Sequence, residues 1–200
     1  MQVENVKADA VTMVKVVLAS THLGDRQFAD YVFHYIQTNN VEMDVYLGNT
    51  LIDLYGRRGS VESAQSVFYQ MSDKNIVSWN AMITSYAKAG NLDSARELFD
   101  KMPVKDVISW TSMITGYSHS NRFSDALTLF REMMVAKVKP DEITVSNVLS
   151  ACAHLGALDT GKAVHNYIHA HTIKADLHVG NALIDMYFKC GCIKKRHWEF

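Results

Sequence analysis

Apolar residues recur along the chain at the spacing of an amphipathic helix. In the segment SWTSMITGYSHS they fall at i, i+3, i+4 and i+7, namely at Trp110, Met113, Ile114 and Tyr117. Residues at this spacing share one face of a helix, so the segment is predicted to be helical with that face buried. A second stripe of the same kind follows at Ala126, Leu129, Phe130 and Met133. The pattern therefore predicts a pair of helices.

The same pair of stripes is found several times. The segment SWNAMITSYAKAG at 78–90 is followed 31 residues later by SWTSMITGYSHSN at 109–121. Self-comparison gives five whole units, at 10–44, 45–75, 76–106, 107–141 and 142–176, which are 35, 31, 31, 35 and 35 residues long. Residues 1–9 match the end of a unit and 177–200 match the beginning of another. We therefore expect the chain to be an excerpt from a longer repeat array.

A break separates the two helices of each unit. It is marked by Gly59, Gly90, Gly156 and Gly191, with Asn121 where a fifth glycine would stand. Glycine and asparagine accept the left-handed backbone that ends many helices. One pair of helices cannot bury both stripes, so the units must stack on their neighbours. The expected fold is all-α: an α-solenoid, a right-handed superhelix of stacked helix-turn-helix repeats of 31 and 35 residues.

Composition changes this picture little. The three cysteines make no disulfide framework, which fits a reducing compartment. No apolar run approaches the ~20 residues of a membrane span, so no membrane association is expected. The formal net charge of −1 provides no general basic field that would indicate a nucleic acid as partner. Composition alone therefore indicates a helical protein and no particular function.

The repeated phrases resemble pentatricopeptide repeats. They are GNTLIDLYGRRGSVESAQSVFYQM, SWNAMITSYAKAGNLDSARELFDKMP, TSMITGYSHSNRFSDALTLFREM and VLSACAHLGALDTGKAVHNYI. The mixed unit lengths are similar to those of the plant PLS subclass, in which P, L and S units alternate. Under this resemblance the chain comprises a P-type tail at 1–9, an L-type unit at 10–44, S-type units at 45–75 and 76–106, a P-type unit at 107–141, an L-type unit at 142–176 and a truncated S-type unit at 177–200.

The resemblance implies binding of single-stranded RNA at roughly one base per repeat. Proteins of this family act in mitochondria or chloroplasts, although no targeting segment is recognised in this chain. The chain would then be part of an organellar RNA editing or processing factor. Its expected partners are single-stranded RNA and other organellar RNA editing or processing proteins.

In this family a base is chosen jointly by the residue after the first-helix aromatic and the last residue of the unit. The corresponding base-reading pairs are Asn49 with Asn75, Asn80 with Asp106, and Thr111 with Asp141. They resemble readers of a pyrimidine leaning to cytosine, of uridine and of guanosine, so the implied core preference is 5′-(C/U)-U-G-3′. Asn and Thr also favour helix starts for local reasons, which leaves a purely structural interpretation open.

Two further sets of residues bear on RNA. In the family, apolar residues at the start of the first helix flank each base, and here these base-flanking residues are Tyr46, Val77, Ile108 and Ile143. Independently of the family, one register position holds the basic row His22, Arg57, Lys88, His119, His154 and Lys189. A basic residue in every unit could follow the phosphates of a strand. The same cations could equally complement the dipole at a helix end.

Candidate catalytic and metal sites are weak. Residues 197–199 read HWE, the letters of the His-x-Glu of zinc deaminases, but no cysteine pair follows. His165 and His169 are spaced i, i+4, as a helical zinc pair would be, yet His165 takes the place of Phe99 and Phe130 and is expected in the core. We therefore expect no catalytic residue, no metal and no cofactor, and we do not expect an enzyme.

Two alternatives to RNA binding remain at the level of sequence. α-Solenoids also serve as protein–protein interaction scaffolds, and a fold does not fix a function. The start at a register position inside a second helix and the departure of 193–200 from the repeat pattern would also fit a truncated, non-functional gene product. The same departure leaves a repeat end uncapped, so self-association through that end is expected.

Overall fold

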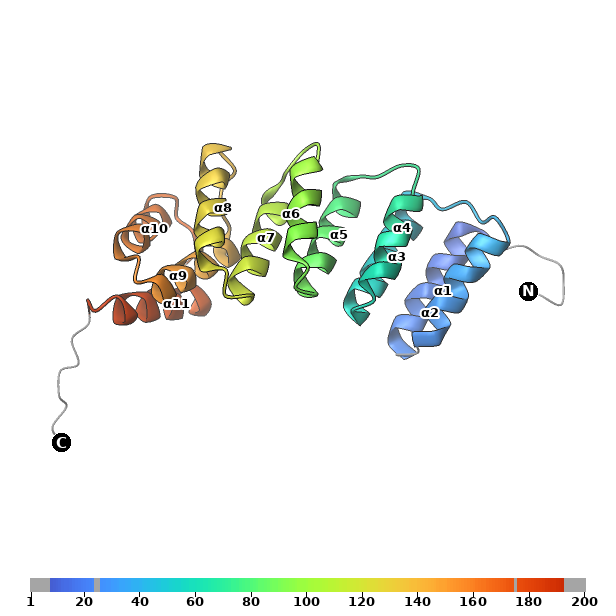
Figure 1. Ribbon diagram of the computed structural model, residues 1–200, viewed down its shortest axis with the longest axis horizontal. Coiled ribbons are helices and arrows are strands. Elements are labelled where there is room, and N and C mark those ends of the chain that lie inside the picture. The colour runs from blue at the N-terminus through green and yellow to red at the C-terminus, as the bar shows by residue number, and fades with distance from the viewer. Residues whose placement is uncertain (1–7, 24–25, 175, 193–200) are drawn as a thin grey trace, which may run out of the picture. The chain divides into compact units, whose positions relative to one another are not determined.

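The computed structural model describes residues 8–23, 26–174 and 176–192, and its eleven helices account for nearly all of this part (Figure 1). Side chains from Ser20 to Ala29 lie outside the description. The chain divides after Val104 into two compact units. Each unit is a stack of helical hairpins, described below by itself.

The first compact unit contains six helices. They are α1 (Ala10–Leu23), α2 (Arg26–Thr38), α3 (Val45–Arg58), α4 (Val61–Gln70), α5 (Ile76–Lys88) and α6 (Leu92–Lys101). The first helices of the hairpins, α1, α3 and α5, pack on one another in series. The second helices cover them, with α2 against α1 and α3, α4 against α3 and α5, and α6 against α5. The result is two layers with the core between them.

The second compact unit repeats this arrangement. Its helices are α7 (Val107–His119), α8 (Phe123–Val135), α9 (Glu142–Leu155), α10 (Leu158–Ala170) and α11 (Leu177–Lys189). First helices α7, α9 and α11 pack in series, α8 lies on α7 and α9, and α10 lies on α9 and α11. The prediction of an all-α fold of stacked helix-turn-helix units is confirmed.

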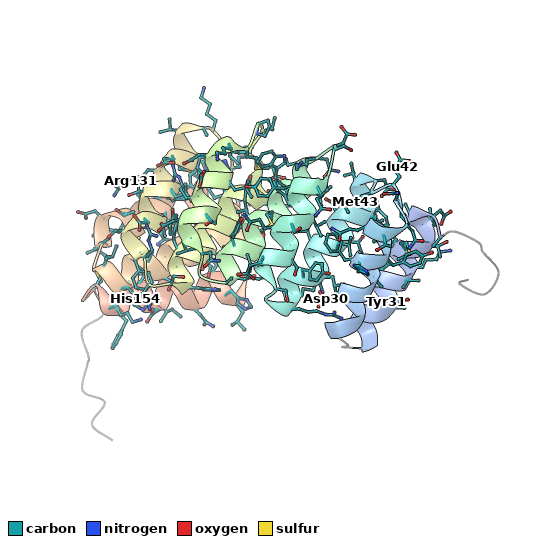
Figure 2. All side chains as sticks on the ribbon, turned by 45° about the vertical axis from the view of Figure 1, so that its right-hand side comes forward. Asp30, Tyr31, Glu42, Met43, Arg131 and His154 are labelled. Carbon is teal, nitrogen blue, oxygen red and sulfur yellow. The ribbon has the colours of Figure 1, made fainter. Side chains whose placement is uncertain are left out.

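The apolar stripes form the core. The first-helix stripe of α7 (Trp110, Met113, Ile114 and Tyr117) and the second-helix stripe of α8 (Ala126, Leu129, Phe130 and Met133) are both buried. The equivalent side chains of the first compact unit are buried as well, apart from the half-buried Trp79. Figure 2 shows side chains filling the space between the helices of each compact unit. Burial of these stripes is what holds each hairpin to its neighbours.

The breaks between paired helices have the expected backbone. Gly59, Gly90, Gly156, Gly191 and Asn121 all have positive φ angles, between 58° and 78°. A left-handed residue turns the chain back so that the second helix can pack on the first. The sequence prediction is confirmed at all five breaks.

The second helices have two different lengths. Helices α4 and α6, in the units predicted to be 31 residues long, have 10 residues each, whereas α2, α8 and α10, in the units predicted to be 35 residues long, have 13. The three longer helices are followed by a left-handed residue that is not glycine: Asn40, Lys137 or Thr172. The extra residues thus add about one turn of helix and a second left-handed bend. The exact unit boundaries stay a prediction.

One expectation about the core is wrong. The sequence places His165 in the slot of Phe99 and Phe130, but the structure leaves it half-buried. Its Nδ1 lies 2.8 Å from the hydroxyl oxygen of Tyr187 on α11. Burying a polar ring without a hydrogen-bond partner costs free energy, and between α10 and α11 the ring has such a partner in Tyr187.

The last described helix carries exposed apolar side chains. On α11, Ile184 is 63% and Phe188 49% exposed. The residues expected to fail as a covering second helix, 193–200, lie outside the described residues, as does the HWE segment within them. Among the described helices, none combines the length and apolar character that crossing a lipid bilayer requires.

Candidate nucleic-acid interface

The last residue of each predicted unit caps the helix that follows it. Each first helix is preceded by an Asp or Asn whose side chain accepts a hydrogen bond from the backbone N–H three residues on: Asp9, Asp44, Asn75, Asp106, Asp141 and Asp176. These distances run from 2.7 to 3.1 Å. Sequence reasoning assigned three of these residues to base reading and noted a preference for helix starts only for Asn and Thr, so it did not recognise the Asp caps. The signal was available, because Asp or Asn directly before an apolar-periodic run marks a helix start.

The pair predicted for the unit 45–75 comes together. Asn49, the fifth residue of α3, donates from Nδ2 to Oδ1 of Asn75 at 3.3 Å. Asn75 is the cap of α5, and its Oδ1 also accepts from the backbone and hydroxyl of Ser78. The two side chains meet because α3 and α5 pack side by side. The Oδ1 atom of Asn49 is buried and accepts no hydrogen bond from the part of the chain that is described.

The pair predicted for the unit 107–141 also comes together. Thr111, the fifth residue of α7, lies 3.4 Å from Oδ1 of Asp141, the cap of α9. A closer contact joins the Thr111 hydroxyl to that of Thr144, at 2.6 Å, and Thr144 in turn donates to Asp141 Oδ1 at 2.6 Å. Sequence reasoning did not single out Thr144.

The third predicted pair falls in two different compact units. Asn80 lies on α5 and is 7% exposed. Asp106 caps α7 through a reciprocal box with Ser109: the Asp106 side chain accepts from the Ser109 backbone, and the Ser109 hydroxyl accepts from the Asp106 backbone. The structure describes each residue within its own unit.

The predicted base-flanking residues are exposed although they are apolar. Tyr46, Val77, Ile108 and Ile143 have exposed fractions of 64, 53, 60 and 59%. Each is the second residue of its first helix, and Val11, which sequence reasoning left out, is 61% exposed at the same place in α1. Single exposed apolar residues need no explanation. Their recurrence at one helical position indicates a surface that a planar apolar group could contact.

These positions belong to one face of each first helix. On α7, residues 108, 111, 115 and 119 are separated by three or four positions and therefore lie along one side of the helix. That face runs from an apolar residue at the helix start, past the polar reading residue, to a basic or imidazole residue at the end. Apolar and hydrogen-bonding groups at one end and cations at the other could contact the bases and the phosphates of a strand.

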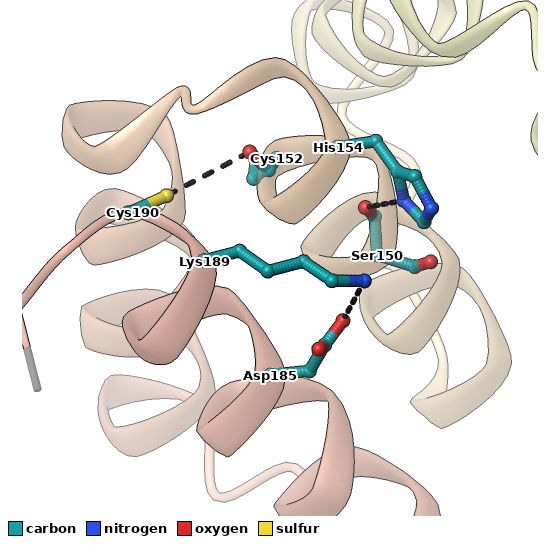
Figure 3. Close-up of polar contacts among 6 residues, drawn as sticks. All are labelled: Ser150, Cys152, His154, Asp185, Lys189 and Cys190. Carbon is teal, nitrogen blue, oxygen red and sulfur yellow. Dashed lines mark hydrogen bonds and ion pairs between the residues drawn. The ribbon is translucent and has the colours of Figure 1, made fainter. Parts of the chain in front are cut away.

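Part of the basic row is already paired within the protein. Arg57 Nε lies 2.8 Å from Asp53 Oδ2, and Lys189 Nζ lies 2.9 Å from Asp185 Oδ2 (Figure 3). The hydrogen bond that Arg57 donates to Asp53, together with the negative charge of Asp53, raises the pKa of Arg57. Such i, i+4 pairs can be read from the sequence, but they were not considered there. The Arg57 and Lys189 charges are therefore partly neutralised.

The remaining members of the row differ from one another. His154 stacks on the ring of Phe123, with centroids 4.3 Å apart, and its Nδ1 lies 2.8 Å from the carbonyl oxygen of Ser150 (Figure 3). Lys88 and His119 are exposed, and the His22 side chain lies outside the described residues. The described row is therefore weaker electrostatically than its residue types alone indicate. No cluster of three or more His, Cys, Asp or Glu side chains suited to a metal occurs in the described part of the chain.

Comparison with known proteins connects this arrangement to a family. Residues 105–154 match the PPR repeat family, and residues 49–76 and 77–107 match the PPR repeat. Together these matches span more than half of the chain. The chain belongs to the pentatricopeptide repeat family.

Known pentatricopeptide repeat proteins of Arabidopsis thaliana are similar over almost the whole chain. A mitochondrial one is 44% identical over 195 residues, which are 98% of this chain and 29% of the relative. A chloroplastic one is 31% identical over 187 residues, which are 94% of this chain and 19% of the relative. This chain thus spans less than a third of the length of these relatives.

A solved structure supports the pentatricopeptide repeat fold. The chain matches the crystal structure of the pentatricopeptide repeat protein PPR10 in complex with an 18-nt psaJ RNA element, with a TM-score of 0.67 and 19% identity. The match covers 90% of this chain and 27% of that one. At this identity the likeness establishes the fold of the repeats.

Proposed function

We propose that this chain binds single-stranded RNA along its row of first helices and selects bases with the paired residues at the helix starts. Membership of the pentatricopeptide repeat family supports binding to RNA, because the similar protein PPR10 has been crystallised with an RNA element. The proposed RNA sequence preference is 5′-(C/U)-U-G-3′. Its three bases would be read, in order, by Asn49 with Asn75, Asn80 with Asp106, and Thr111 with Asp141.

One observation carries the proposal. In both pairs that lie within a single compact unit, the fifth residue of one first helix contacts the cap of the next: Asn49 contacts Asn75 and Thr111 contacts Asp141. In each pair the first-helix residue lies three helix positions after an exposed apolar residue, Tyr46 before Asn49 and Ile108 before Thr111. A base placed there would meet polar atoms at its edge and an apolar surface at its face, which is the combination that single-stranded RNA readers use.

A wider role is proposed as well. We propose a segment of a PLS-type RNA editing or processing factor, with units bounded as in the sequence analysis and with no catalysis by the segment itself. The proposed location is a mitochondrion or chloroplast, as the names of the similar proteins indicate. Other organellar editing or processing proteins are the proposed protein partners.

The test is a titration of the full chain with short single-stranded RNAs at low salt. Wild type should prefer a probe containing 5′-CUG over 5′-CUA and 5′-CGG by about tenfold, because a matched base edge is worth about 1–3 kcal/mol of discrimination. Thr111→Asn should move the preference at the third base from guanosine to uridine. Fluorescence anisotropy would give each dissociation constant.

A matched control makes this test specific. Thr128→Asn introduces the same substitution on α8, whose Thr128 side chain is exposed on the layer of second helices. It should leave the preference for CUG unchanged. Binding of every probe with equal affinity would refute base selection, and absence of binding at low salt would favour a protein-interaction scaffold.

A further inference from the structure

The hydroxyl of Thr144 lies between the two residues proposed to read guanosine. Its oxygen is 2.6 Å from the hydroxyl oxygen of Thr111 and 2.6 Å from Oδ1 of Asp141. The backbone N–H of Thr144 donates to the same carboxylate oxygen at 2.7 Å. The Thr144 side chain is fully buried, and Thr111 is 8% exposed. Thr144 is therefore fixed in place by the start of α9 and touches both members of the pair.

The protons of these hydroxyl groups can be assigned by counting. Each threonine hydroxyl has one proton, and the Asp141 carboxylate has none to donate. The 2.6 Å contact between Thr144 and Asp141 requires the Thr144 proton, because two acceptors would repel at that distance. The 2.6 Å contact between the two threonines then requires the proton of Thr111. Thr111 therefore donates inward to Thr144.

This assignment decides what a base meets. With its proton turned toward Thr144, the Thr111 oxygen offers only lone pairs to a ligand. Asp141 Oδ2 accepts no hydrogen bond from the described residues and also offers lone pairs. The site thus presents two acceptors. Among the four RNA bases, guanine alone places two neighbouring donors, N1–H and N2–H, on its Watson–Crick edge, whereas adenine pairs a donor with an acceptor.

We propose that Thr144 is a positioning residue that makes the Thr111–Asp141 pair selective for guanosine by holding the Thr111 hydroxyl proton away from the base. This inference rests on the proposed function and adds a third residue, contributed by the next unit, to the reader. The pair in the unit 45–75 has a different arrangement. There Asn49 bonds to Asn75 directly, and among the described residues the Ser78 hydroxyl is bonded to Asn75 and not to Asn49.

The test compares three variants of the full chain on probes with guanosine, inosine or adenosine at the third base of 5′-CUN. Thr144→Val replaces the hydroxyl by a methyl group of similar size. The Thr111 proton then has two acceptors within reach, Asp141 Oδ1 at 3.4 Å and N1 of a bound adenine, so it is no longer held away from the base. The preference of this variant for guanosine over adenosine should fall about tenfold or more, the value of one hydrogen bond to a charged or well-placed group. Thr144→Ser retains a hydroxyl at this position, so the ratio of guanosine to adenosine affinity should stay within about twofold of the wild-type value.

A third variant controls for loss of a helix cap. Ser109→Ala also removes a hydroxyl that is buried and bonded to a capping carboxylate, that of Asp106, but it lies at the start of α7. It should weaken folding to a similar extent and leave the ratio of guanosine to adenosine affinity at the third base unchanged. In wild type, inosine, which lacks the N2 amino group, should bind more weakly than guanosine and more tightly than adenosine.

Failure of the two ideas can be told apart. A wild-type chain that binds RNA without preferring guanosine at the third base would overturn the proposed function and the role of Thr144 with it. A wild-type chain that prefers guanosine, together with a folded Thr144→Val that keeps the same ratio, would overturn the role of Thr144 alone. An equal loss of the ratio in Thr144→Val and Ser109→Ala would also overturn it, because the cause would then be the cap.

Discussion

Lys137 and Thr172 occupy left-handed backbone although neither is a glycine or an asparagine. A residue with a Cβ is disfavoured there, at a cost on the order of 1–3 kcal/mol, and the branched Cβ of Thr172 is more strained than the unbranched Cβ of Lys137. Both residues follow a second helix of 13 residues and direct the chain back toward the next first helix. The left-handed bend is thus determined by the packing of the hairpins, which overrides the backbone preference of the residue at the bend.

Cysteine chemistry provides a test at the same scale. Burial raises the pKa of the Cys152 thiol to about 11, with a smaller contribution from nearby Cys190. A raised pKa leaves less of the reactive thiolate, so at pH 8 only about one thiol in a thousand would be ionised. We predict that iodoacetamide modifies exposed Cys192 on the order of 100-fold faster than Cys152, as followed by mass spectrometry.

Denaturation supplies the control for this prediction. In urea above the unfolding midpoint, Cys152 and Cys192 should react at similar rates, because burial is then lost. Equal rates in the folded protein would contradict the burial of Cys152 between α9 and its neighbours. The sulfur of Cys190, which donates to the carbonyl of Cys152 at 3.8 Å, should show an intermediate rate (Figure 3).

At the scale of elements, close approach of the first helices depends on small residues. Gly56 on α3 faces Ser85 on α5, and a Cβ at Gly56 would overlap the Ser85 hydroxyl oxygen. Ser85 itself is 4% exposed and bonded to the carbonyl of Ala81, so it cannot move away easily. The spacing between these two helices is therefore set by the absence of a side chain.

A pair of glycine substitutions tests this spacing. Gly56→Ala should destabilise the first compact unit by about 1–3 kcal/mol through overpacking. Gly180→Ala on α11, where a Cβ meets nothing within 4 Å in the described structure, should stabilise by up to about 1 kcal/mol because alanine favours helix. The urea midpoint, followed by circular dichroism, would show shifts of opposite sign. Stabilisation of both variants would mean that helix propensity dominates at both sites, and the close approach at Gly56 would then not limit the spacing.

The elements themselves could be predicted from the sequence almost completely. The spacing of Trp110, Met113 and Tyr117 indicates a buried helical face, and Gly59 marks a break, because both signals are local and repeated in every unit. The bend at Thr172 could not be foreseen, since it depends on where the next first helix packs. His165 was misplaced because a register argument says which slot a residue occupies and not whether its ring finds a hydrogen-bond partner.

The candidate site could be predicted from the sequence only in part. The contact of Thr111 with Asp141 follows the expectation drawn from the family, but its role as a base reader stays a prediction. The capping role of Asp141 could have been predicted, because Asp directly before an apolar-periodic run marks a helix start, but it was not considered. The position of Thr144 could not be read, because it requires knowing that the starts of α7 and α9 lie side by side. Contacts between units depend on stacking geometry, which no single repeat contains.

For the whole molecule, charge balance limits how strongly RNA can be attracted. The net charge is −1, and two members of the basic row are engaged by acidic residues one turn earlier on the same helix. Binding should therefore depend only modestly on salt, because few phosphates are neutralised. The relative that is 44% identical is more than three times as long as this chain.

Breaking one ion pair of the basic row tests whether such pairing weakens RNA binding. Asp53→Asn frees Arg57 for a phosphate, and we predict about twofold to threefold tighter RNA binding at low salt. The plot of log affinity against log salt concentration should steepen by about 0.7, the value for one additional phosphate contact on a single strand. Titrations at four salt concentrations would measure the slope.

The control removes the same charge on the other layer. Asp100→Asn releases Arg96, its partner at 3.0 Å, on the second helix α6. It changes the net charge equally and should leave the salt slope unchanged. A slope that rises in both variants would show that RNA responds to the total charge of the chain, and the basic row would then have no special part in binding.

The helix caps have a consequence for how such a protein can change its target over evolutionary time. The six described first helices are each preceded by a capping Asp or Asn, and replacing a cap by alanine typically costs about 1 kcal/mol in stability. Mutations that survive selection for folding are thus confined to a few residue types at this position. Under the proposed function, one member of each base-reading pair must also cap a helix, so few residue types are allowed there. New base specificities would therefore arise mainly by substitution of the other member, such as Asn49 or Thr111.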